Sequence, residues 1–116
     1  MKKRKALLIE NPQIDYFEGG AFDIPHANSI LPIINQLIPQ FETIIVTLDW
    51  HPANHVSFAA THAWRQVGQI IEVEEISIEL KPIHCVQNTF GAKIHPQLID
   101  QDRLIAIKKG LSLIHI

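Results

Sequence analysis

A short segment after the most apolar run of the sequence combines one carboxylate with two imidazoles. Asp49, His51 and His55 come directly after the β-rich run 43–48. Residues two apart on an extended segment point to the same side, so Asp49 and His51 can face one ion together. One carboxylate with two or three imidazoles is a ligand set for Zn²⁺, Fe²⁺ or Mn²⁺. An Asp-x-His pair after a strand can also be a hydrogen-bonded loop pair, so the spacing alone leaves both interpretations open.

The elements expected to position this segment form a strand–helix–strand unit. Residues 6–9 predict one short buried strand, and the run 43–48 predicts a second. Five residues between them recur with the spacing of an amphipathic helix: Ile30, Ile33, Ile34, Leu37 and Ile38. Asn28 or Ser29 is expected to cap this helix, and Pro32 is tolerated because it falls in the first turn. Such a unit pairs its strands in parallel through a right-handed crossover, and open sheets of this kind bind ligands at the carboxyl ends of their strands.

The rest of the chain predicts two further strands within one small α/β domain. Residues 52–69 are loop-like, residues 70–73 predict a short strand, and residues 104–107 predict another buried strand. At 116 residues the chain can form one small domain, and nothing in it indicates two. A three-stranded α/β sheet has poorly covered edges, so we expect the natural domain to contain further strand–helix units.

Composition excludes several classes of function. The formal net charge is −2, which argues against a broad nucleic-acid-binding surface, and no apolar stretch is long enough to span a membrane. The single cysteine, Cys85, cannot form an internal disulfide and suits a reducing compartment, so we expect a cytoplasmic location. The expected partner is a small molecule, and the oligomeric state, a homo-oligomer included, stays open.

Three motifs, in matching order, resemble the nicotinamidase branch of the isochorismatase-like cysteine hydrolases. They are residues 6–21 with Gln13 and the Gly19-Gly20 pair, residues 47–58 around Asp49, and residues 82–92 followed by His95-Pro96. The resemblance covers most of residues 6–110, which corresponds to the amino-terminal half of such an enzyme. It implies a three-layer α/β/α fold with a parallel sheet. It also implies hydrolysis of a small amide, typically nicotinamide to nicotinate and ammonia in the salvage of NAD.

The resemblance also assigns roles to individual residues. Three residues would be ligands of a divalent metal ion: Asp49, His51 and His84. His55 would be a fourth ligand in some relatives and a neighbour of the ligands in others. Lys109 would be the catalytic lysine at the end of its strand, and Tyr16 would stack on the substrate ring. The metal would orient the substrate through its ring nitrogen, beside a cysteine thiolate that attacks the carboxamide carbon.

The chain departs from the family's pattern at three points. Asn11 stands where the catalytic Asp is expected, and an amide cannot accept a proton at neutral pH. Glu10 is a poor substitute, because successive strand side chains face opposite ways and it should point to the other face. Lys81 stands where a tryptophan would help to clamp the substrate ring. The nucleophilic cysteine is expected beyond the lysine strand, and Cys85 does not replace it, because a lone cysteine is usually a small buried hydrophobe.

These departures leave two kinds of function open. The first is an enzyme: a nicotinamidase-like amidohydrolase, or a related hydrolase of another small amide or an enol ether. Residues 1–110 would be its amino-terminal part, and we expect this truncated form to be inactive. The second is a non-catalytic metal- or ligand-binding relative, for which Asn11 is the main argument. Residues 111–116, Leu-Ser-Leu-Ile-His-Ile, match the translation of a transposon-end sequencing adapter, so we expect them to be a read-through tail.

Overall fold

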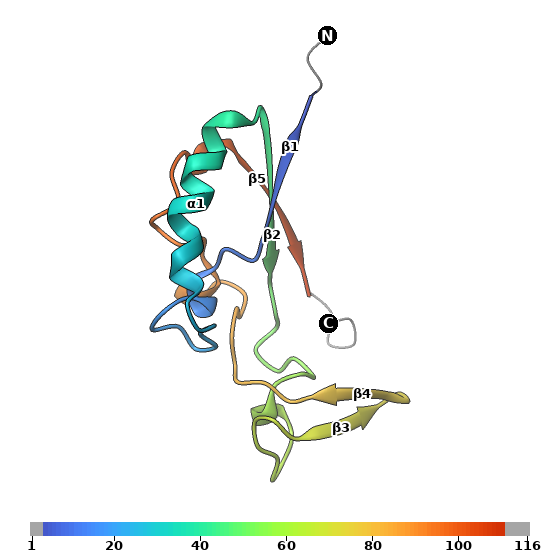
Figure 1. Ribbon diagram of the computed structural model, residues 1–116. Helices are drawn as coiled ribbons and strands as arrows, with labels where there is room; N and C mark the ends of the chain where they lie inside the picture. Colours follow the sequence, from blue (N-terminus) through green and yellow to red (C-terminus); the bar gives the residue numbers. More distant parts are fainter. Residues whose placement is uncertain (1–3, 111–116) are drawn as a thin grey trace.

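A three-stranded parallel sheet with one α-helix against it forms the centre of the fold, and loops make up much of the rest (Figure 1). The computed structural model describes residues 4–110. Its strands are Ala6–Glu10 (β1), Thr43–Asp49 (β2), Ile70–Val73 (β3), Ile76–Glu79 (β4) and Leu104–Lys109 (β5), and its α-helix is Ile30–Leu37 (α1). Short 3₁₀ helices occupy the connections: Ile14–Tyr16, Ala27–Ser29, Ile38–Gln40, Ala59–Thr61, Phe90–Ala92 and Gln101–Arg103. The sheet order is β1–β2–β5, and β3 and β4 form a separate antiparallel hairpin that projects away from it.

The register of the sheet places the ends of neighbouring strands beside each other. β1 pairs with β2 in parallel, and β2 pairs with β5 in parallel up to the pair Asp49↔Lys109. The parallel pairing predicted for residues 6–9 and 43–48 is therefore confirmed, as is the strand predicted at residues 104–107. Because all three strands run the same way, their carboxyl ends meet at one edge of the sheet.

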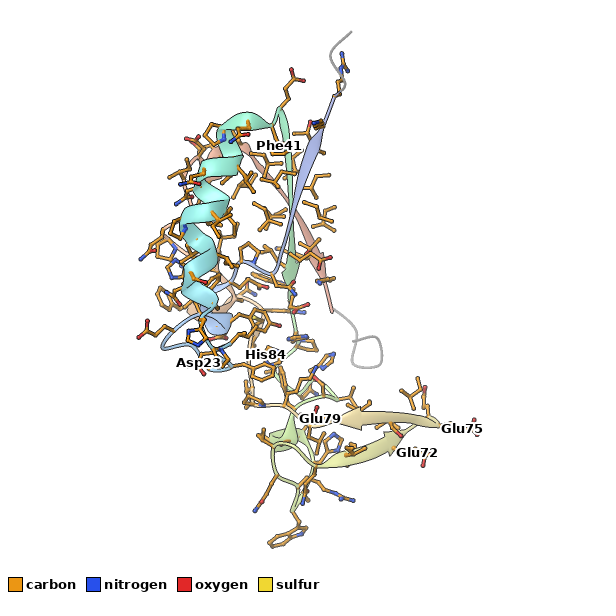
Figure 2. All side chains as sticks on the ribbon, viewed as in Figure 1. Asp23, Phe41, Glu72, Glu75, Glu79 and His84 are labelled. Atoms are coloured by element: carbon orange, nitrogen blue, oxygen red, sulfur yellow. The ribbon has the colours of Figure 1, made fainter. Side chains whose placement is uncertain are left out.

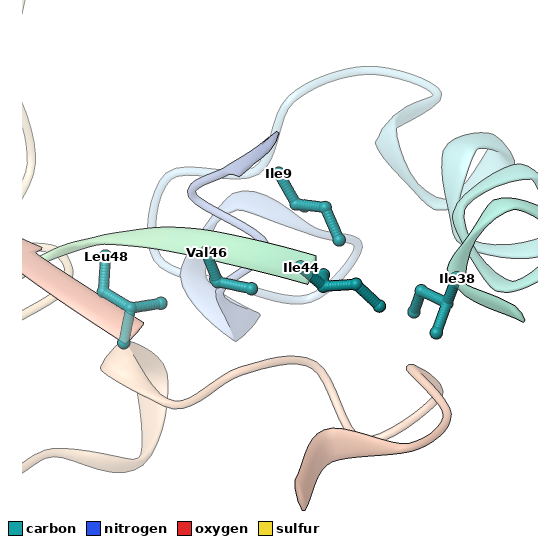
Figure 3. Close-up of a cluster of buried hydrophobic side chains, with 5 residues drawn as sticks. All are labelled: Ile9, Ile38, Ile44, Val46 and Leu48. Atoms are coloured by element: carbon teal, nitrogen blue, oxygen red, sulfur yellow. The ribbon is translucent and has the colours of Figure 1, made fainter. Parts of the chain in front are cut away.

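The main apolar core lies between the sheet and α1. Burial alternates along β2, so that every second side chain faces the helix, as a period of two requires. The five buried members of this cluster pack together in Figure 3: Ile9, Ile38, Ile44, Val46 and Leu48. The helix packs against them with Ile34, and the 3₁₀ turn that follows it contributes Ile38 itself. This packing fixes the strands whose ends carry Asn11 and Asp49.

The opposite face of the sheet is apolar and exposed. Leu8 is 56% exposed, Ile105 54% and Ile107 52%. The α/β class and the parallel sheet are as predicted, and within residues 4–110 an α-helix covers one face of the sheet. None of the helices in this part of the chain is long and apolar enough to cross a membrane. The tail expected at residues 111–116 lies outside the described residues.

Two local features differ from the sequence prediction. Neither expected cap binds the helix, because Ser29 donates back to the His26 carbonyl (2.7 Å) and Asn28 accepts a hydrogen bond from Glu18 N–H (2.8 Å). Strand β4 was not predicted at all. Its hairpin turns at Glu74 and Glu75, which both have positive φ (49° and 67°). Tight hairpins of this kind usually carry Asn or Gly at these positions, so the turn had no sequence signal.

Candidate functional site

A cavity of about 410 Å³ opens at the carboxyl ends of β1 and β2. Its walls are aromatic and aliphatic: Tyr16, Phe17, Phe22, Ile24, Ala27 and Ile30. Polar and charged side chains border the rest: Glu10, Asn11, Asp49, Lys81 and His84. Figure 2 shows His84 below the sheet, on the side of the β3–β4 hairpin. A volume of this size and an apolar lining with a few converging polar groups are typical of small-molecule sites.

Asp49 is held at the end of β2 through both its backbone and its side chain. The fully buried Gln13 side chain accepts a hydrogen bond from the Asp49 N–H (2.8 Å) and donates one to the Asp49 carbonyl (2.7 Å). The Tyr16 hydroxyl donates to Asp49 Oδ2, and Lys109 Nζ lies 3.8 Å from Asp49 Oδ1. The neighbouring Lys108 has a different partner, since its Nζ lies 4.2 Å from the centre of the Trp50 ring. The structure therefore brings three of the predicted site residues together: Tyr16, Asp49 and Lys109.

Backbone pairing brings His51 and His84 together. The His51 N–H donates to the Cys85 carbonyl (2.9 Å), and the His51 carbonyl accepts from the Gln87 N–H (2.8 Å). The ring centroids of the two histidines lie 5.0 Å apart, and each residue is only 4% exposed. The Nδ1 of His51 donates to the His84 carbonyl (3.0 Å), and the Nδ1 of His84 donates to the Pro82 carbonyl (2.7 Å). Because Nδ1 of each ring carries the proton, the lone pair of Nε2 is available to accept a hydrogen bond or to bind a metal.

His55 lies behind His51. Its ring centroid is 4.6 Å from that of His51, and its side chain is fully buried. Its Nδ1 lies 3.2 Å from the Ser57 backbone nitrogen and 2.7 Å from Ser57 Oγ. Which ring nitrogen carries the proton depends on the tautomer, because Ser57 Oγ can either donate to Nδ1 or accept from it. The geometry places His55 against His51 and leaves both roles open for it, fourth ligand or neighbour of the ligands.

Burial sets the protonation of two side chains that border the cavity. Burial lowers the pKa of His84 below its usual value, which keeps its ring neutral and able to bind a metal. Burial, and then the hydrogen bond to Asp49, raise the pKa of the Tyr16 phenol above its usual value. The Tyr16 hydroxyl therefore stays protonated and acts as the donor to the carboxylate.

The types of donor atom at this site suit a divalent metal ion, but their present positions do not yet form a metal site. Asp49 supplies a carboxylate, and His51 and His84 supply rings whose Nδ1 atoms are held by carbonyls, as is usual for metal-binding histidines. Among residues 4–110, however, no three His, Cys, Asp or Glu side chains are close enough to hold an ion as they stand.

Asn11 and Glu10 both border the cavity. The Asn11 N–H donates to the Thr47 carbonyl (2.8 Å), and its Oδ1 is buried with no hydrogen-bond partner in the described part of the chain. Glu10 is the exposed last residue of β1 and also borders this cavity, and the expected direction of its side chain, toward the other face of the sheet, stays a prediction. Asn11, which follows it, has a φ of 54°.

Cys85 is packed as a structural residue. It is fully buried, and its N–H donates to Asp15 Oδ2 (2.8 Å). Burial, and then the charge of Asp15, raise the pKa of the Cys85 thiol to about 12. A thiol of this kind is not a nucleophile at neutral pH, in agreement with its exclusion on sequence grounds.

Two residues with a part in this geometry had no role in the sequence interpretation. Gln13 also donates to the Ala92 carbonyl (2.9 Å), so one amide joins three segments of the chain. Gly110 has a φ of 70°, and a Cβ placed there would lie 3.1 Å from His51 Nε2 and 3.9 Å from Asp49 Oδ1. A glycine directly after Lys109 was the available signal for Gly110, and Gln13 had none in its neighbourhood.

Comparisons with known proteins agree with this picture. No protein-family model matches the chain. Its sequence is 40% identical over 105 residues to a nicotinamidase of Acinetobacter baylyi, which covers 90% of this chain and 49% of the relative. A solved nicotinamidase and pyrazinamidase of Acinetobacter baumanii superposes with a TM-score of 0.87 at 40% identity, over 93% of this chain and 52% of that one.

A third relative carries a metal. The pyrazinamidase of Pyrococcus horikoshii, solved in complex with zinc, superposes with a TM-score of 0.70 at 32% identity, over 92% of this chain and 52% of its own. The chain thus spans about half the length of the relatives it matches, with 49% of the curated sequence and 52% of each solved structure covered.

Proposed function

Because the chain belongs to the nicotinamidase family of isochorismatase-like hydrolases, of which it spans about half, we propose that it is part of an amidohydrolase. The proposed reaction converts nicotinamide and water to nicotinate and ammonia, and serves the salvage of pyridine nucleotides in the cytoplasm. The observation that carries the proposal is the convergence of Asp49, Lys109 and the His51–His84 pair beside one cavity. The aromatic walls of that cavity suit a flat heteroaromatic ring.

Within this proposal Asp49, His51 and His84 bind a divalent metal ion. Carboxylate oxygen and imidazole nitrogen suit Zn²⁺, Fe²⁺ and Mn²⁺, so the ligand types leave the ion open among the three. When bound, the ion would supply a Lewis acid that takes the ring nitrogen of the substrate. Tyr16 and Phe22 border the cavity as a wall for the ring, and their own ring centroids are 6.2 Å apart.

A zinc titration of the chain tests this ligand set. We expect Asp49→Ala and His84→Ala each to weaken zinc binding strongly, because each removes one of three ligands. His26→Asn is the matched control, since His26 is exposed and its positive φ (62°) suits asparagine. Zinc binding that is as tight in Asp49→Ala and His84→Ala as in the wild type would refute the ligand set.

The catalytic step depends on Asn11. A carboxylate at this position would take the proton of an attacking thiol, whereas the Asn11 amide cannot. The test is an ammonia-release assay with nicotinamide on the full-length gene product, run beside Asn11→Asp. We expect slow turnover in the native form and faster turnover in Asn11→Asp, because the amide leaves the thiol without its general base. Inactivity of the native form together with strong activity of Asn11→Asp would refute the active-enzyme proposal.

That second outcome favours the alternative function, a non-catalytic relative that binds a metal or a small ligand. The observation behind it is the neutral Asn11 side chain, whose buried Oδ1 borders the cavity without a partner in residues 4–110. Nicotinamide binding without ammonia release, measured by calorimetry on the same full-length protein, distinguishes the two functions.

We further propose that the 116-residue chain has no turnover of its own. Cys85 is its single cysteine, and that thiol is fully buried with a raised pKa. Lys109 is available beside Asp49, but an acyl-enzyme needs a reactive thiolate as well. Measurable ammonia release by the purified chain, unaffected by Cys85→Ala, would show that another nucleophile serves.

A further inference from the structure

Tyr16 is more firmly placed than a side chain that only lines a cavity. Its backbone belongs to the 3₁₀ turn Ile14–Tyr16, where its N–H donates to the Gln13 carbonyl (3.0 Å). Its carbonyl accepts the Ile24 N–H (3.0 Å), so the residue is tied to the chain on both sides of the turn. Its ring meets the His84 ring edge-on, with centroids 5.5 Å apart. These contacts leave the phenol little freedom to swing.

The Tyr16 hydroxyl donates its hydrogen bond to one of the two carboxylate oxygens of Asp49. It donates to Oδ2, while Lys109 Nζ approaches Oδ1 at 3.8 Å. Oδ1 is also the Asp49 oxygen nearer to Gly110, since a Cβ placed on Gly110 would lie 3.9 Å from Oδ1 and 3.1 Å from His51 Nε2. The two oxygens of this carboxylate therefore face different partners.

From this asymmetry we infer that Tyr16 is a positioning residue for the metal site, whose phenol holds Asp49 Oδ2 so that Oδ1 is presented on the His51 side. The inference rests on the proposed metal site and deepens it. The proposed ion would bind Asp49 through one oxygen, because the hydrogen bond from Tyr16 occupies the other. Groups that hydrogen-bond a ligating carboxylate typically contribute 10- to 100-fold to metal affinity.

The competing explanation is that Tyr16 serves only as an aromatic wall. Tyr16→Phe separates the two, because it keeps the ring against His84 and removes only the oxygen that reaches Asp49. A matched control is Thr89→Val, which removes a hydroxyl that donates to the Val86 carbonyl (2.7 Å), away from Asp49. Both variants lose one hydroxyl hydrogen bond, and only one of them loses it at the metal site.

The experiment is a zinc titration of the 116-residue chain by calorimetry, for the wild type and both variants. We expect Tyr16→Phe to bind zinc about 10-fold more weakly, and Thr89→Val to bind like the wild type. Equal affinities in the wild type and Tyr16→Phe would overturn the role of Tyr16 and leave the metal site intact. Failure of the wild type to bind zinc would overturn the metal site and, with it, this inference.

A second measurement needs no variant. Tyr16 is the only tyrosine of the chain, so ¹³C labelling of the phenol carbon gives one resonance. We expect zinc to shift that resonance in step with the calorimetric titration, because the acceptor of the phenol proton becomes a metal ligand. A resonance that stays in place while zinc binds would contradict the inference, even if Tyr16→Phe failed to fold.

Discussion

Replacing Gly110 by alanine tests whether His51 and Asp49 converge where the structure places them. The new Cβ would lie 3.0 Å from His51 Cδ2 and 3.1 Å from His51 Nε2. Ordinary carbon contacts fall at about 3.5–4.0 Å, so the His51 ring would have to move by about half an ångström. The ring has little room to do so, since it is 4% exposed and its Nδ1 is held by the His84 carbonyl at 3.0 Å.

Backbone strain has to be separated from this clash. Gly110 has a φ of 70°, and an alanine in that region costs about 1–2 kcal/mol. Gly68→Ala is the matched control, because Gly68 has a φ of 92° and nothing lies within 4 Å of its Cβ position. Gly68→Ala therefore measures the cost of the positive φ alone, without a steric clash of the new Cβ. The overpacking of His51 adds about 1–3 kcal/mol to the loss in Gly110→Ala.

Urea unfolding and a zinc titration together measure both effects. We expect Gly110→Ala to unfold at a lower urea concentration than Gly68→Ala, and to bind zinc about 10-fold more weakly than the wild type, which is about 1.4 kcal/mol. Gly68→Ala should bind zinc normally. If Gly110→Ala loses no more stability than Gly68→Ala and binds zinc like the wild type, Gly110 does not lie against the ligands and the proposed site is misplaced.

Three further outcomes follow from buried groups. Gln13→Leu should lower the free energy of unfolding by about 3 kcal/mol, because it removes three hydrogen bonds to the backbone. The control Gln36→Leu, at an exposed position, should change it little, and urea unfolding measures both. Phe58→Ala should cost about 3–5 kcal/mol and also weaken zinc binding, since the fully buried Phe58 ring packs 5.4 Å from the rings of His51 and His84. Above pH 9 the stability should fall, because the raised pKa values of Cys85 (about 12, from 9.0) and Tyr16 mean that the unfolded chain releases these protons first. Cys85→Ala should therefore flatten the alkaline decline in thermal unfolding, and an unchanged slope would contradict the thiol's assignment.

The sheet was predictable from the sequence because its strands rest on local patterns. The apolar runs at residues 6–9, 43–48 and 104–107 have the length and composition of buried parallel strands, and all three form parallel strands. Their predicted burial is correct for alternate residues of β2 and wrong for most of β1 and β5, whose outer face is exposed. Once these strands pair in register, Asp49 and Lys109 must be neighbours. The hairpin strand β4 escaped prediction because its turn is made by two glutamates with positive φ, which have no local preference for that conformation.

The contacts that depend on distant segments were not predictable in the same way. Gln13 reaches Asp49 and Ala92, which lie 36 and 79 residues away, and nothing in its neighbourhood signals this. Tyr16 was identified as a wall for the substrate ring, and its hydrogen bond to Asp49 emerged only from the structure. Side-chain partners across a fold are set by packing, which a single sequence does not record.

The charges at the candidate site explain why Asn11 matters more than any other departure from the family's pattern. Asp49 is the partner of Lys109, so this pair is close to neutral without help from position 11. A carboxylate there would border the same cavity as Glu10 and Asp49, and like charges in a partly buried site raise the pKa of one of them. A raised carboxylate pKa is what a general base near neutral pH requires. With Asn11 the site keeps its proposed metal ligands, its lysine and its aromatic walls, and lacks that base, so we expect position 11 to affect the reaction more than the binding of a substrate.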